Sequence, residues 1–222
     1  MTLPAYIAGQ KVLTAKEFLT FTEPELPAGD MKKGGTKMEK LRQAILAHRP
    51  GCEQEEADRR MMLELLESRR NLLTRENTTA HFTASAWLTN ESRTKVLMVY
   101  HNIYRSWSWT GGHADGEADL LRVARREAME ETGLQKIRTV SEDIYSLEIL
   151  TVDGHIKRGS YVPSHLHLNL TYLLEADETE ELAVKPDENS GVRWFPLEEA
   201  LQACTEPWMI QWIYSKLNDR LG

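Results

Sequence analysis

The feature that most constrains this 222-residue chain is a glycine-rich loop that runs directly into a segment with three clustered glutamates. The loop contains Gly111 and Gly112, and the glutamates are Glu127, Glu130 and Glu131. At about 100° per residue, their i, i+3, i+4 spacing places the three carboxylates on one face of a helix. Like charges at this spacing repel one another and weaken a helix, so we expect a bound cation to hold them. Clustered oxygen ligands suit Mg²⁺ or Mn²⁺ rather than Zn²⁺, which prefers Cys and His.

The residues around the glutamates suit a helix with a defined start and end. Asp119 can cap the first turn by accepting a hydrogen bond from a free backbone N–H group. Gly133 follows the last turn, where a left-handed cap favours glycine. Arg126 can hold a glutamate in place by a bidentate contact. An apolar stripe that would pack on a sheet is formed by Leu120, Leu121, Ala124 and Ala128.

This segment resembles the signature of Nudix hydrolases. That signature reads Gly, five residues, Glu, seven residues, Arg-Glu, an aliphatic residue, any residue, Glu-Glu, any residue, Gly and an aliphatic residue. The positions in register are Gly112, Arg126, Glu127, Ala128, Glu130, Glu131, Gly133 and Leu134. One position departs, because Ala118 stands where the family has its first glutamate, between Glu117 and Asp119. In the family this glutamate supports the loop and the metal shell, so either a neighbour replaces it or catalysis is weakened.

The resemblance implies a metal-dependent enzyme that hydrolyses the diphosphate bond of a nucleoside diphosphate linked to another group. The implied metal ligands are the Gly112 carbonyl, Glu127, Glu130 and Glu131, with Mg²⁺ as the cofactor and Mn²⁺ as the alternative. The implied catalytic residues are Arg126, Glu127, Glu130, Glu131 and Glu188. Glu188 is included because it lies in a loop before the last strand, at a spacing similar to that of family members with a loop base. Asp187 is the alternative to it.

Two other functions remain open. Ala118 favours a Nudix-like nucleotide sensor that binds without turnover, although three intact helix glutamates argue against it. A diphosphate isomerase of the isopentenyl-diphosphate type shares the fold but uses a catalytic cysteine. Neither Cys52 nor Cys204 lies near the motif.

Aromatic residues and glycines next to the motif are candidates for substrate binding. Tyr104 and Trp107 precede the loop and could stack on a nucleobase, whereas packing under the loop is the simpler role for Trp109. Gly111 and Gly112 would let the backbone approach the substrate because no Cβ stands in the way.

His165 and His167 share one face of a predicted strand, and we also assign them to substrate binding. Zinc is disfavoured there because no Cys or third His stands at supporting spacing, so we expect them to line the pocket or to form hydrogen bonds on the sheet. Lys157 and Arg158 lie in a predicted loop and could contact phosphate.

Alternation and apolar runs predict strands at residues 81–89, 95–101, 144–152, 165–172 and 192–195, followed by helices at 196–203 and 206–221. Strands and helices alternate without an internal repeat or a regular βαβ order. This agrees with the fold that the resemblance implies for residues 78–222, an α/β (α+β) class with an α/β/α sandwich around a mixed sheet.

Residues 1–77 form a predicted extension. It consists of a linker to about residue 37 and two helices, from about residue 39 to Arg49 and from about Gln54 to Arg70. These helices either pack on the domain or form a homodimer contact, and core packing is the simpler of the two.

Composition excludes several classes of partner. The net charge of −7 and pI near 5.6 argue against a nucleic-acid polymer, which requires a basic surface. No signal peptide and no apolar run of about 18 residues are present, so neither secretion nor a membrane partner is expected. Two isolated cysteines suit a reduced, cytoplasmic protein. The partner that the resemblance to Nudix hydrolases implies is a small-molecule nucleotide or diphosphate substrate.

Overall fold

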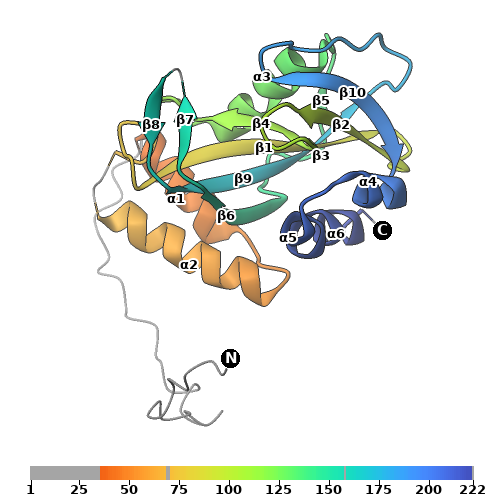
Figure 1. Cartoon of the computed structure of the whole chain (residues 1–222). Coiled ribbons are helices and arrows are strands. Elements are labelled where there is room, and N and C mark those ends of the chain that lie inside the picture. The colour runs from red at the N-terminus through yellow and green to blue at the C-terminus, as the bar shows by residue number, and fades with distance from the viewer. Residues whose placement is uncertain (1–35, 69–70, 158, 222) are drawn as a thin grey trace, which may run out of the picture. The chain divides into compact units, whose positions relative to one another are not determined.

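In the computed structural model, the described residues are 36–68, 71–157 and 159–221, and an eight-stranded mixed sheet forms their centre (Figure 1). The strands are β1 (Ala80–Asn90), β2 (Lys95–His101), β3 (Ser106–Ser108), β4 (Thr110–His113), β5 (Arg138–Thr139), β6 (Ser146–Val152), β9 (His165–Ala176) and β10 (Asn189–Pro196). The main order is β10-β2-β1-β9-β5, with β3 paired to β2, β4 to β1 and β6 to β9. Strands β1 and β9 run parallel and the other pairs run antiparallel, so the sheet is mixed, as predicted.

Helices cover both faces of this sheet, which confirms the predicted α/β/α sandwich (Figure 1). On one face α3 (Leu120–Thr132) buries its apolar stripe against alternate residues of β1 and β9, such as Phe82 and Leu168. The opposite face is covered by α4 (Leu197–Ala203), α5 (Pro207–Met209), a π-helical turn (Ile210–Tyr214) and α6 (Ser215–Asp219). Trp87 points to this second face, because successive residues of a strand alternate between faces.

Two helices precede the sheet, α1 (Lys37–Ala47) and α2 (Glu53–Glu67). Leu41, Ile45 and Met62 are buried in the same apolar core as α3, and α2 packs against β6. These helices therefore pack on the sheet, which is the simpler of the two roles considered for them. The linker predicted for residues 1–37 lies almost entirely outside the described residues, and a domain boundary at residue 77 stays a prediction.

Two predicted elements differ in the structure. The sequence pattern predicts one regular helix over residues 206–221, but the π-helical turn Ile210–Tyr214 interrupts it. It predicts a loop over residues 154–159, but β7 (His155–Lys157) and β8 (Ser160–Val162) form a hairpin. Three-residue strands are too short to show alternation, so periodicity could not find them. Lys157 thus ends a strand, and Arg158 lies outside the described residues.

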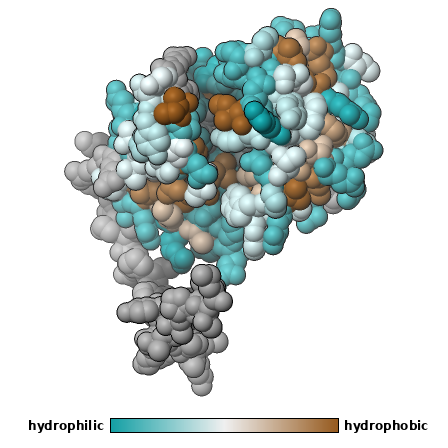
Figure 2. All heavy atoms as spheres, viewed as in Figure 1, coloured by the Kyte–Doolittle hydropathy of each residue, from teal (hydrophilic) through white to brown (hydrophobic). Residues whose placement is uncertain are grey.

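The surface carries no large apolar band on the face shown in Figure 2, where hydrophobic residues form separate small patches among hydrophilic ones. Exposed large side chains include Ile103, Ile156, Trp208 and Trp212. Within the described residues, no helix is both long and apolar enough to span a membrane.

Candidate active site

Helix α3 has the ends that its sequence predicts. The Asp119 side chain accepts a hydrogen bond from the Arg122 backbone N–H at 3.0 Å. Gly133 adopts a left-handed φ of 78°, and its N–H donates to the Met129 carbonyl at 3.0 Å. A methyl group at Gly133 would also meet Ala183 Cβ at 2.7 Å. The caps at Asp119 and Gly133 therefore determine where the helix begins and ends, and so where its glutamates lie along the chain.

Gly112 of β4 lies directly against the first of these glutamates. A Cβ added at Gly112 would lie 2.5 Å from Glu127 Cδ and 2.7 Å from Glu127 Oε2. Glycine therefore lets the β4 backbone approach the carboxylate, which brings the two predicted metal-binding residues together. The Glu127 side chain is only 14% exposed, so it sits in the crevice between strand and helix.

Arg126 connects two of the helix glutamates. Its Nε and Nη2 groups both donate to Glu127 Oε1, at 3.3 and 2.7 Å. Its Nε also lies 3.9 Å from Glu130 Oε1. The contact to Glu127 uses one carboxylate oxygen rather than two, so Arg126 orients the group without the symmetric bidentate pairing that we expected.

Glu131 is the most enclosed of the helix glutamates, with 4% of the residue exposed. Its Oε1 accepts a hydrogen bond from the Gly111 N–H at 3.1 Å. The pKa of this carboxyl is raised to about 8. Burial is the largest cause and the charges of Glu188 and Glu127 add to it, while the Gly111 hydrogen bond acts in the opposite direction. Three acidic groups from a helix and a loop therefore share one electrostatic environment.

The loop before β10 reaches this environment because it completes the end of α3. The Ala183 N–H donates to the Thr132 carbonyl at 2.8 Å, and Asn189 Nδ2 donates to the Glu131 carbonyl at 2.9 Å. These bonds satisfy carbonyls that the helix leaves free at its last turn. The loop is thus held across the C-terminus of α3, with Glu188 next to its anchor Asn189.

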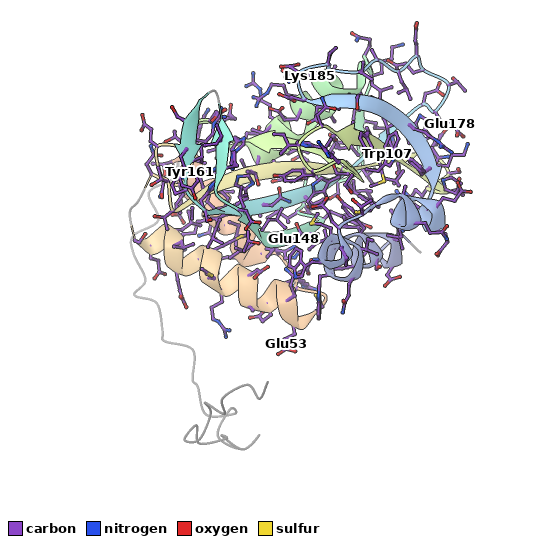
Figure 3. The ribbon with its side chains drawn as sticks, viewed as in Figure 1. Glu53, Trp107, Glu148, Tyr161, Glu178 and Lys185 are labelled. Carbon is purple, nitrogen blue, oxygen red and sulfur yellow. The ribbon has the colours of Figure 1, made fainter. Side chains whose placement is uncertain are left out.

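The side chain of Lys185, a residue of this loop, extends toward α3 (Figure 3). Its Nζ is 3.4 Å from Glu130 Oε2 and 3.1 Å from Glu188 Oε1. The loop carboxylate predicted from spacing therefore does lie beside the helix carboxylates. Sequence reasoning missed Lys185, since a single lysine in an acidic loop gives no signal of its own.

Both neighbours of Ala118, where the family has its first glutamate, are held by partners of their own. Ala118 itself is buried, with 7% exposed. Glu117 accepts a hydrogen bond from the Asp119 N–H at 3.1 Å and pairs with Lys37 at 3.3 Å and Arg122 at 3.7 Å. Asp119 is used as the helix cap. Both carboxylates thus have partners other than the Glu127–Glu131 group.

The aromatic candidates have mixed surroundings. Tyr104 is half exposed, and its ring centroid lies 4.5 Å from that of His101. Trp107 packs edge-on against Tyr100 and Phe195, with ring centroids 5.6 and 4.8 Å apart. Of these rings, Tyr104 is the one with a large exposed surface, whereas the Trp107 ring contributes to packing. Stacking on a nucleobase stays a prediction for both.

Trp109 packs against the C-terminal helices rather than only under the loop. Its ring lies edge-on to Tyr214 at 5.5 Å, and its backbone N–H donates to the Tyr214 hydroxyl at 3.3 Å. Nearby, Pro207, Trp208 and Met209 of α5 and Leu150 and Thr151 of β6 line a cavity of about 360 Å³. One of the lining residues, Leu150, pairs with His167 in the sheet.

His165 and His167 do have a third histidine nearby, which corrects the expectation drawn from sequence spacing. His81 of β1 pairs directly with His167 of β9. The ligand nitrogens of His81, His165 and His167 all lie within 4.8 Å of one another. Sequence spacing missed this group because the parallel pairing of β1 with β9 joins segments far apart in the chain.

The donor set around Gly112 and α3 fits a hard divalent cation. Glu127 and Glu131 are enclosed, Glu130 is half exposed, and Glu188 adds a fourth carboxylate from the loop. Carboxylate and carbonyl oxygens are the ligands that Mg²⁺ and Mn²⁺ prefer. With a divalent cation bound, such a site can bind a diphosphate, whose negative charge the carboxylates alone would repel.

Comparison with known proteins gives one family. The family model of the NUDIX domain matches residues 79–215 of the chain, which is more than half of its length. Among curated proteins, no sequence matches the chain.

Several solved structures resemble this one at low identity. A C. elegans Ap4A hydrolase binary complex is 19% identical, with 63% of this chain and 96% of that chain covered and a TM-score of 0.47. The E. coli dihydroneopterin triphosphate pyrophosphohydrolase is 11% identical, with 63% and 95% covered and a TM-score of 0.46. A MutT protein from Methanosarcina mazei Go1 is 16% identical, with 63% and 94% covered and a TM-score of 0.46. At these values they identify no substrate for this chain.

Proposed function

Because this chain belongs to the Nudix family, whose members are pyrophosphohydrolases, we propose that it hydrolyses the diphosphate bond of a nucleoside diphosphate linked to another group, and that it requires Mg²⁺. The family and the enzyme class agree with the motif that begins at Gly112. The observation that carries the proposal is the meeting of four carboxylates from α3 and the β10 loop beside the Gly112 backbone. Mn²⁺ is the alternative cofactor.

We infer separate roles for the residues of this site. Glu127, Glu130, Glu131 and the Gly112 carbonyl would hold the metal. When bound, a divalent metal neutralises the diphosphate, orients it and lowers the pKa of a coordinated water. Arg126 would fix the orientation of Glu127, since it donates two hydrogen bonds to one carboxylate oxygen. Glu188 would accept the proton of the attacking water, because it is half exposed and lies beside Glu130 through Lys185.

The two alternatives are less well supported. A sensor without turnover needs no set of metal carboxylates, yet all three helix glutamates of the motif are present and grouped. An isomerase with a catalytic cysteine needs a thiol at the site. Cys204 is buried in the core formed with the C-terminal helices and Cys52 directly precedes α2, so neither contacts the carboxylates.

The test is a panel of nucleoside diphosphate derivatives, assayed with Mg²⁺ for release of phosphate or nucleotide. We expect at least one compound to be cleaved, and the cleavage to stop in excess EDTA and return with added Mg²⁺. Glu130→Gln should lose activity, whereas Glu142→Gln, an exposed glutamate in the loop before β6, should retain it. Full turnover in EDTA would refute the metal requirement. Tight nucleotide binding without cleavage of any compound would favour the sensor.

A further inference from the structure

A second group of possible metal ligands lies on the sheet, apart from the glutamates. His81 comes from β1, His165 and His167 come from β9, and their ligand nitrogens lie within 4.8 Å of one another. We propose that these three histidines bind one transition-metal ion, with Zn²⁺ as the first candidate. The proposal does not depend on the hydrolase activity, because none of the three residues belongs to the carboxylate set.

The spacing of two of the rings matches a shared ion. His165 Nε2 and His167 Nε2 are 3.2 Å apart. Zinc–nitrogen bonds of about 2.0–2.1 Å in a tetrahedral arrangement place neighbouring nitrogens roughly 3.3–3.4 Å apart. The two nitrogens are therefore already at the separation that coordination requires. A direct hydrogen bond between the two rings is the competing explanation.

The hydrogen bonds of two rings present the correct nitrogen to an ion. His165 Nδ1 lies 2.8 Å from the Pro163 carbonyl, and His81 Nδ1 lies 3.0 Å from the Asn77 carbonyl. A carbonyl only accepts, so each Nδ1 carries the proton and each Nε2 carries a lone pair. Metal-bound histidines usually donate their other N–H to a carbonyl or carboxylate in this way.

His81 supplies the strongest indication. The residue is 3% exposed, and among the described residues its Nε2 has no hydrogen-bond partner. A buried polar atom without a partner is costly, and a native protein usually satisfies it with a bond to another group, water or an ion. Because His81 offers a ligand nitrogen within 4.8 Å of those of His165 and His167, a metal ion bound by all three would supply a partner for Nε2.

The ligand types distinguish this site from the one on α3. Three imidazoles without a carboxylate suit Zn²⁺, Ni²⁺ or Cu²⁺ and do not suit Mg²⁺. Three protein ligands leave a fourth position for water or another donor. His113 lies next to the triad, with its ring centroid 4.9 Å from that of His167 and 5.2 Å from that of His81. It directly follows Gly112, so β4 connects the two sites in the chain.

The direct test is calorimetric titration of Zn²⁺ into the full metal-free chain, in the presence of excess Mg²⁺. We expect one equivalent to bind and the Tm to rise. His165→Ala and His167→Ala should each weaken Zn²⁺ binding by at least about 100-fold. His155→Ala is the matched control, since its ring lies 6.4 Å from that of His165 and its Nδ1 bonds to the Asp153 carbonyl. It should keep the wild-type affinity.

Two further measurements make the result independent of folding and of catalysis. Glu130→Gln should lose hydrolysis yet keep Zn²⁺ binding, so failure of one site can be told from failure of the other. Co²⁺ bound to the wild type should show ligand-field absorption without a thiolate charge-transfer band, which excludes Cys52 and Cys204 as ligands. Absence of tight Zn²⁺ binding, or unchanged binding in the double variant His165→Ala/His167→Ala, would overturn the proposal.

Discussion

Gly112 and Glu127 lie so close together that a single methyl group on the glycine would overlap the carboxyl group of the glutamate. A Cβ at this position would lie 2.5 Å from Glu127 Cδ, well inside van der Waals contact. The glycine of the Nudix signature thus has a steric reason in this chain. It allows a strand backbone to lie beside a helix carboxylate, and any side chain at this position must displace that carboxylate.

Gly112→Ala should therefore reduce activity by moving Glu127. We expect kcat to fall by roughly 10-fold or more, since small displacements in an active site are costly, while the Tm changes by only a few degrees. The measurement is a double-mutant cycle with Glu127→Ala. If the clash with Glu127 is the cause, the effect of Gly112→Ala should largely disappear in the Glu127→Ala background. Equal effects in both backgrounds would assign the loss to the backbone instead.

The three helix glutamates should behave as one unit. Glu127→Gln, Glu130→Gln and Glu131→Gln should each lower kcat by about 10² or more, with smaller effects on KM, because each leaves a metal short of a ligand where charge develops. A double variant should be little worse than the worse single one. Glu188→Gln should fall between these variants and the exposed control Glu142→Gln. Near-wild-type turnover in all three would mean that α3 is not the catalytic centre.

Mg²⁺ affinity should depend on the ionisation of Glu131. Burial raises the pKa of its carboxyl to about 8, so in the metal-free protein it holds a proton below that pH. Metal binding must release this proton, so at limiting Mg²⁺ activity should rise as the pH increases towards about 8. Mg²⁺ titrations at several pH values give the dependence, and Glu131→Gln should flatten it.

The same shift affects stability in the opposite direction. In the unfolded chain the Glu131 carboxyl ionises near its ordinary pKa of 4.5, whereas in the folded, metal-free chain it ionises near 8. Between these values the folded state binds more protons, so its free energy of unfolding falls as the pH rises. Denaturant unfolding with and without saturating Mg²⁺ measures this dependence. If the free energy of unfolding of the metal-free protein instead rose with pH over this range, and Glu131→Gln abolished that rise, the result would contradict the pKa shift.

The motif helix was predictable because its determinants are local. The cap Asp119, the apolar stripe and Gly133 stand within one short segment, and each acts over a single turn. The position of Glu188 near the helix glutamates was expected from a spacing similar to that of family members, while its role as a base stays a prediction. The grouping of His81 with His167 was not predictable, because it depends on which strands pair in parallel. The alternation of polar and apolar residues shows which side chains share a face of a strand, but it does not show which other strand pairs with it.

Glu117 offers a test of the departure at Ala118. Its carboxylate faces Lys37 and Arg122, at 3.3 and 3.7 Å, and does not contact the helix glutamates. Glu117→Gln should therefore change kcat by less than about threefold, since the carboxylate pairs only with two basic side chains outside the metal-binding group and such pairs are weak. Steady-state kinetics beside Glu127→Gln gives the comparison. A loss as large as that of Glu127→Gln would show that Glu117 does replace the missing glutamate.

Glu55 of α2 connects the N-terminal helices to the rest of the fold. It is fully buried and accepts hydrogen bonds from Ser146 Oγ at 2.7 Å and from the Gly51 N–H at 2.8 Å. It also pairs with Lys216 at 3.2 Å and Arg220 at 2.5 Å. One carboxylate thus links α2 to β6 and to the C-terminal helix.

Removing the charge of Glu55 should destabilise the protein strongly. Breaking a buried ion pair leaves its partners uncompensated, so Glu55→Gln should lower the free energy of unfolding by about 3 kcal/mol. Burial acts to raise the pKa of Glu55, but hydrogen bonds from His48, Arg220 and neighbouring groups hold it well below its usual value of 4.5. The folded state therefore binds fewer protons, and the stabilisation is present above pH 4.5 and is lost as the pH falls below it.

Urea unfolding at neutral and acid pH measures both effects of Glu55. Wild-type stability should drop as the pH falls below about 4.5, and the drop should be smaller in Glu55→Gln because the titrating group is gone. Glu53→Gln is the matched control, since Glu53 is exposed on the same helix (Figure 3). It should alter stability by less than about 0.5 kcal/mol, as surface substitutions usually do. Equal stability of the Glu55 and Glu53 variants at neutral pH would show that the buried carboxylate does not hold α2 to β6 and the C-terminal helix.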